Sequence, residues 1–128
     1  MSFHIEQQIW DAFPGMLLVV AHGRNLDNSF KRPHLEDSLR RISSRLKSEW
    51  VYPNAQSHPY VSAWRQSLKR VGVSPANYPC AIESLCRLAL SGRELHSINP
   101  LVDFYNLQSL EHISPVGGWD VGSGRTIT

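Results

Sequence analysis

Apolar positions between residues 33 and 113 recur at intervals of three and four, which is the spacing of one face of an α-helix. The first such series steps by four, three and four, with one more position a turn further on, and comprises Leu35, Leu39, Ile42, Leu46 and Trp50. This series predicts an amphipathic helix from about Pro33 to Trp50.

Two further helices are predicted between residues 59 and 92. One runs from about Pro59 to Val71, where Gly72 is a typical helix-end residue. Its expected inner stripe is Tyr60, Ala63, Trp64, Leu68 and Val71. The next helix opens at Pro79 and stops at Ser91-Gly92.

A fourth helix is predicted after Asn99, because asparagine is a good N-cap and Pro100 suits the first helical position. Its inner face carries Val102, Asn106, Ser109, Leu110 and Ile113. Asn106 is the polar exception on this face. Its carboxamide is expected either to bond a neighbouring loop within the core or to face a small-molecule pocket.

The parts of the chain outside these helices favour strands. Met16 to Ala21 is short, apolar and partly β-branched, which predicts a buried strand. The stretch from Phe3 to Phe13 fits a helix or a strand equally well, and Trp119 to Val121 is expected to form another strand. Strands at both ends with helices between them predict an α+β fold in a single domain, residues 1–128.

Composition favours a globular cytoplasmic protein. The chain is 41% hydrophobic and 19% charged, and no apolar run approaches the ~20 residues of a membrane span. The N-terminus lacks the basic segment and apolar core of a signal peptide. We therefore expect no membrane partner.

Charge is unevenly distributed along the chain. Residues 31–93 contain 11 Lys/Arg and four Asp/Glu, whereas the remainder contains two and seven. The basic positions on the first two predicted helices are Arg40, Arg41, Arg45, Arg65, Lys69 and Arg70. They indicate either an RNA-binding surface or two ordinary solvated helix faces.

Motifs for metals and cofactors are missing from the sequence. The six histidines are scattered, and Cys80 and Cys86 are spaced for different helix faces. We expect no metal and no cofactor. His22 directly follows the predicted strand, so it is expected either to line a pocket or to play a structural part.

An ordered set of short motifs runs through the second half of the chain. After the helix stops at Ser114-Pro115 comes Val116-Gly117-Gly118, where glycine lets the backbone approach another group closely. The set comprises Trp64-Arg65, Gly72-Val73-Ser74-Pro75, Ile82-Glu83-Ser84-Leu85, Asn99 to Asp103, Asn106, Pro115 and Asp120. Over residues 59–121 the chain resembles the editing (B3/B4) domain of the bacterial phenylalanyl-tRNA synthetase beta subunit, and more closely the free-standing proteins built on that domain.

The resemblance implies an α+β architecture with helices packed on a mixed or antiparallel sheet. The family domain continues with further strands beyond the position of Thr128. This sequence therefore looks like the N-terminal part of such a domain. Either it is a fragment, or a second chain or protomer completes the sheet.

The resemblance also implies a reaction, the trans-editing hydrolysis of misacylated aminoacyl-tRNA by a positioned water. Asn106 and Pro115 match pocket residues of the family, whereas Gly117 stands where the synthetase domain has a histidine. We expect Asn106 to orient the substrate and the N–H groups of Gly117 and Gly118 to act as donors. Pro115, Val116 and His22 are expected to bind substrate, and the six basic residues to bind tRNA.

Two other functions fit the same sequence. A non-catalytic module binding RNA or an amino acid would use the same basic bias. A purely structural piece would find its function in a partner chain.

Overall fold

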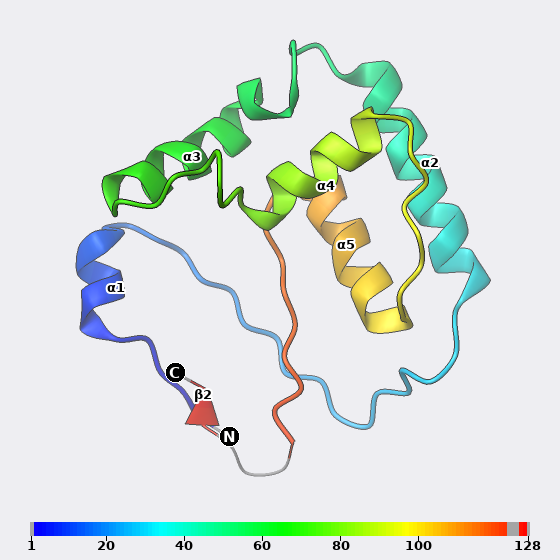
Figure 1. Ribbon diagram of the computed structural model, residues 1–128. Helices are drawn as coiled ribbons and strands as arrows, with labels where there is room; N and C mark the ends of the chain where they lie inside the picture. The colour runs from blue at the N-terminus through cyan, green and yellow to red at the C-terminus, as the bar shows by residue number, and fades with distance from the viewer. Residues whose placement is uncertain (1, 123–125, 128) are drawn as a thin grey trace. The chain divides into compact units, whose positions relative to one another are not determined.

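The computed structural model describes residues 2–122 and 126–127 (Figure 1). The chain divides into two compact units. Residues 27–118 form the helical unit, and residues 1–26 with 119–128 form the terminal unit.

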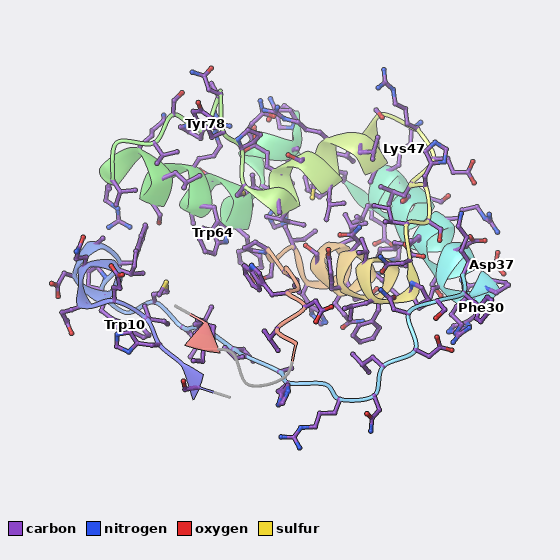
Figure 2. All side chains as sticks on the ribbon, turned by 60° about the horizontal axis from the view of Figure 1, so that its bottom comes forward. Trp10, Phe30, Asp37, Lys47, Trp64 and Tyr78 are labelled. Atoms are coloured by element: carbon purple, nitrogen blue, oxygen red, sulfur yellow. The ribbon has the colours of Figure 1, made fainter. Side chains whose placement is uncertain are left out.

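The helical unit contains the four helices that the sequence predicts, together with a short 3-10 turn. Their bounds are α2 Pro33–Glu49, η1 Ala55–Ser57, α3 Pro59–Arg70, α4 Ala81–Leu90 and α5 Pro100–His112. Helices α2, α4 and α5 pack against one another, and η1 contacts both α3 and α4 (Figure 1). Figure 2 labels Asp37 near the N-terminal end of α2 and Lys47 near its C-terminal end.

Proline and side-chain caps set the starts of these helices. Asn99 Oδ1 accepts the Val102 N–H at 2.9 Å, as its predicted N-cap role requires. Asn28 Oδ1 accepts the Leu101 N–H at 2.9 Å, which satisfies a second unpaired donor of α5. His58 Nδ1 accepts the Tyr60 N–H at 3.2 Å and caps α3.

The end of α5 reverses the chain. Ile113 adopts the left-handed conformation, with φ 47° and ψ 51°, and the Ser114 N–H donates to the Ser109 carbonyl at 3.1 Å. This is the Schellman arrangement, in which glycine is usual. A branched residue there costs of order 1–3 kcal/mol. Burial of the Ile113 side chain, which is only 9% exposed, offsets that cost.

The core lies among α2, α4, α5 and the start of α3. Its buried members are Ile42, Ala55, Val61, Ile82, Cys86, Ala89, Leu110 and Ile113. The predicted inner stripe of α3 is wrong, because Tyr60 is 62% exposed and Trp64 36% exposed while Val61 is fully buried. Arg65, one turn after Val61, donates to the buried Glu83. This ion pair favours burial of the face of α3 that carries Val61 and Arg65 over the predicted, purely apolar face.

The observed secondary structure differs from the predicted α+β fold class. The structure is 50% helix and 2% strand, so the α+β prediction and its B3/B4-like sheet are wrong. In the terminal unit α1 spans Gln7–Ala12, and β1 (Ser2–Phe3) pairs in parallel with β2 (Thr126–Ile127). The undecided N-terminal stretch thus contains a short strand and a short helix.

Neither of the other predicted strands forms within the described residues. Met16 to Ala21 and Trp119 to Val121 have no regular secondary structure. Leu17 is 86% and Val19 83% exposed, so the expected burial of the first run is also wrong. The sequence favours a strand locally, but a strand needs a neighbour to pair its N–H and C=O groups. Described residues offer none there.

The cap of α3 leads to a pH prediction. Burial holds the pKa of His58 below its ordinary value. The native state therefore binds fewer protons at this site than the unfolded state, and protonation would also remove the Nδ1 acceptor. We expect the free energy of unfolding to fall as the pH drops below about 6.5, the ordinary pKa of histidine.

The measurement is urea unfolding at pH 7.5 and pH 5.5, with His58→Asn as the matched control. Asparagine caps helices without titrating, so the variant should lose less stability over this interval than the parent chain. Equal losses in the two proteins would show that His58 is not responsible.

Candidate functional site

The segment that follows α5 runs back along that helix. Ser109 Oγ donates to the Ser114 carbonyl at 2.5 Å, which holds the first residue of the segment. At the other end, a methyl group on Gly118 would lie 3.1 Å from Cε1 of Tyr105 and 3.9 Å from Cδ2 of Leu101. Gly118 is thus a position of close backbone approach, as the sequence predicts.

Asn106 lies on α5 within one helical turn of both contacts. It is half-buried, and its carboxamide forms no hydrogen bond with any residue that the structure describes. The alternative of a core asparagine bonded to a neighbouring loop therefore finds no partner here. A half-buried amide without a partner has donors and an acceptor available for a ligand.

The segment after α5 carries four more of the predicted site residues. Pro115 is half-buried, Val116 is 37% exposed, and Gly117 and Gly118 are exposed. The N–H groups of both glycines donate to no acceptor within residues 2–122 and 126–127. Five of the predicted catalytic and substrate-binding residues thus lie on α5 or on the segment that packs along Tyr105 and Ser109 of this helix.

His22 is the sixth of those residues, and it belongs to the terminal unit. Its side chain is exposed. The predicted role at a pocket rim depends on a strand before it, and residues 16–21 form none.

Two of the six predicted RNA-binding residues, Arg40 and Arg45, form exposed ion pairs with carboxylates of the same chain. Arg40 pairs with Asp37 and, at 3.6 Å, with Glu94. Arg45 Nη2 lies 3.0 Å from Glu111 Oε1. Each exposed ion pair of this kind adds little stability. It nevertheless lowers the net positive charge that the surface presents to a phosphate.

The rest of that set differs in its surroundings. Arg65 is held by Glu83 and is only 21% exposed, so it faces the protein interior. Arg41 and Arg70 donate to nearby serines, and Lys69 has no ion-pair partner in the described part of the chain. These three side chains leave a smaller basic surface on α2 and α3 than the sequence predicts.

Glu83 and Asp103 belong to the motifs noted in the sequence, but their full burial was not predicted. Arg65 Nη1 and Arg87 Nη2 donate to Glu83 Oε1 at 2.7 and 2.5 Å, while Glu83 Oε2 has no hydrogen-bond partner among the described residues. Asp103 accepts the Ser97 hydroxyl at 2.5 Å and the Ile98 N–H at 2.9 Å. The sequence feature that could have indicated the burial of Glu83 is its position on the apolar face of α4, three residues before Cys86.

The described residues hold no group of three His, Cys, Asp or Glu side chains arranged for a metal ion. Cys80 and Cys86 are both free thiols, and burial raises the pKa of Cys86 to about 12. A thiol in that state is a small apolar core group, not a nucleophile. No helix among the described residues is both long enough and apolar enough to cross a membrane.

Comparisons with protein-family models, with curated proteins and with solved structures gave no match for this chain.

Proposed function

We propose that this chain hydrolyses the ester bond of misacylated aminoacyl-tRNA at the site formed by α5 and the segment after it. The observation that carries the proposal is the unbonded carboxamide of Asn106. It lies within one turn of the two contacts that hold the diglycine segment against the helix. The resemblance of the same residues to a tRNA-editing domain indicates the reaction.

Hydrolysis of the aminoacyl ester requires few groups from the protein. Water adds to the ester carbonyl, and the tetrahedral intermediate expels the ribose hydroxyl, which takes up a proton and leaves a free amino acid. The site must hold the amino acid close to a water and stabilise the oxyanion. Asn106 orients the substrate in this proposal, and the N–H groups of Gly117 and Gly118 are oxyanion donors.

The tRNA partner requires a basic surface. Arg41, Lys69 and Arg70 carry that role, because no carboxylate in the described part of the chain neutralises them.

A cytoplasmic location gives the protein access to aminoacyl-tRNA. A second chain or protomer that supplies further strands is also part of the proposal, and the exposed residues 17–21, which have no regular secondary structure, could pair with it.

One observation favours a second function, binding without turnover. The site has no general base of its own, because none of its residues has a titratable side chain. These residues are Asn106, Pro115, Val116, Gly117 and Gly118. A module that recognises an aminoacyl or RNA group needs no general base.

Hydrolysis of a panel of matched and mismatched aminoacyl-tRNAs tests the proposal. We expect selective release of one amino acid, and Asn106→Ala should lower kcat/KM by about 10²-fold or more, the usual effect of losing a polar group that acts on the transition state. The affinity for tRNA should change less than about twofold, because Asn106 contacts no phosphate in this proposal.

Gln108→Ala is the matched control, since it removes another carboxamide from the same helix and should retain full activity. Because Asn106 makes no hydrogen bond with the described residues, its substitution should also leave the unfolding midpoint nearly unchanged. No release by the parent chain, with tRNA still bound at low salt, would establish the binding function instead. A large loss of stability in Asn106→Ala would assign this residue to the core.

A further inference from the structure

An open groove of about 390 Å³ lies between the C-terminal parts of α2 and α4 and the connection that contains η1. Its size is within the range of small-molecule sites. It shares no residue with Asn106 or with the segment after α5. The side chains that give it chemical character are Lys47, Trp50, Asn54, Gln56, Arg87 and Ser91.

The charge of this groove is positive. None of the residues that line it is acidic. Lys47 is exposed and forms no ion pair with any described residue. Arg87 is 43% exposed, and its Nη2 is held at 2.5 Å by Glu83, which is fully buried.

Glu83 makes Arg87 a preorganised cation. One guanidinium nitrogen is fixed by the carboxylate, and the exposed part of the group has further N–H donors in a rigid fork. Glu83 accepts from Arg65 as well, so this cluster of three residues keeps a net positive charge. A fixed arginine fork beside an exposed lysine suits a phosphate, which accepts several charge-assisted hydrogen bonds.

The remainder of the groove suits a planar heterocycle. Trp50 lies 5.1 Å from His58 between ring centres and donates its indole N–H to the Asn54 carbonyl at 3.3 Å, so its ring is held in place. Gln56 is half-buried, and its carboxamide has no partner among the described residues. A free carboxamide can both donate to and accept from a base edge, and an aromatic ring can stack on the base.

We propose that this groove binds a nucleotide, with its phosphate on Lys47 and Arg87 and its base against Trp50 and Gln56. The nucleotide is either a free mononucleotide or the 5′-terminal nucleotide of an RNA strand. The groove binds it whether or not the α5 site hydrolyses an ester.

Calorimetric titration of the full chain with four probes tests this proposal. The probes are AMP, adenosine, inorganic phosphate and a 5′-phosphorylated hexa-adenylate. AMP should bind at least about tenfold more tightly than adenosine or phosphate alone, because it uses both ends of the groove. A strand that binds about tenfold more tightly than AMP identifies RNA as the source of the nucleotide, and the reverse order identifies a free nucleotide.

Lys47→Gln is the decisive variant, since Lys47 is exposed and unpaired and its loss should not affect folding. It should weaken AMP or strand binding about tenfold, the effect of one charge-assisted contact to phosphate. Lys31→Gln, which removes the same charge from the exposed loop before α2, outside the groove and outside the proposed tRNA-binding residues, should leave binding unchanged. Three results would each overturn the proposal: no binding of any probe, equal affinity for AMP and adenosine, or binding insensitive to Lys47→Gln.

Discussion

Replacing Glu83 with glutamine is expected to lower the free energy of unfolding by about 3 kcal/mol, the lower end of the cost of breaking a buried ion pair. Glu83 is fully buried and accepts from both Arg65 and Arg87. A neutral amide leaves two cations beside each other, and the Arg65 side chain is only 21% exposed, so water compensates it poorly. Arg87 can turn toward solvent, which limits the loss.

Urea unfolding checks this effect, with Glu111→Gln as the matched control. Glu111 also accepts from an arginine, Arg45, but that pair is exposed, so its loss should cost below about 1 kcal/mol. The double substitution Glu83→Leu with Arg65→Met should recover part of the stability, because a buried pair can often be replaced by apolar residues. Equal losses in Glu83→Gln and Glu111→Gln would contradict a structural role for the cluster.

The helices were predictable because their signals are local. Pro33, Pro59 and Pro100 each occupy the first turn of a helix, and Asn99 forms the N-cap bond that its residue type suggests. These signals act within a few residues of sequence, and the regular spacing of apolar positions supports them. The helix bounds consequently agree with the sequence to within about two residues.

The fold class was not predictable from local signals. Met16 to Ala21 has the composition of a buried strand, but strand formation depends on a partner that the local sequence does not specify. The prediction of which face of α3 is buried was wrong for a related reason. Apolarity alone placed Trp64 inside, whereas a charge pair between Arg65 and Glu83, 18 positions apart, favours a different face.

The candidate site was predictable in part. The end of α5 and the close backbone approach at Gly118 agree with the sequence prediction, because proline and glycine act locally there. The left-handed Ile113 that reverses the chain was not predicted. The lack of a partner for Asn106 depends on which loops pass its side chain. The groove at Lys47 was missed, because its residues come from α2, η1 and α4 and share no sequence motif.

Leu110→Ala is expected to lower the free energy of unfolding by about 3 kcal/mol, within the usual range for a buried leucine. Leu110 is fully buried on α5 and belongs to the core cluster with Ile42, Val61 and Ile82. Its truncation removes apolar contacts and leaves a cavity that close-packed neighbours fill only in part.

The matched control is Leu101→Ala, which removes the same atoms from a position on α5 that is 37% exposed. It should cost about 1–2 kcal/mol less than Leu110→Ala, because more than a third of the residue already faces water in the folded chain. The Leu110→Ala variant also distinguishes an effect on stability from an effect on catalysis, since Leu110 touches neither substrate nor tRNA in the proposed site. At a temperature where Leu110→Ala is folded, it should retain the aminoacyl-tRNA activity that Asn106→Ala loses. A parallel loss in both variants would show that the packing of α5, not the Asn106 carboxamide, controls the reaction.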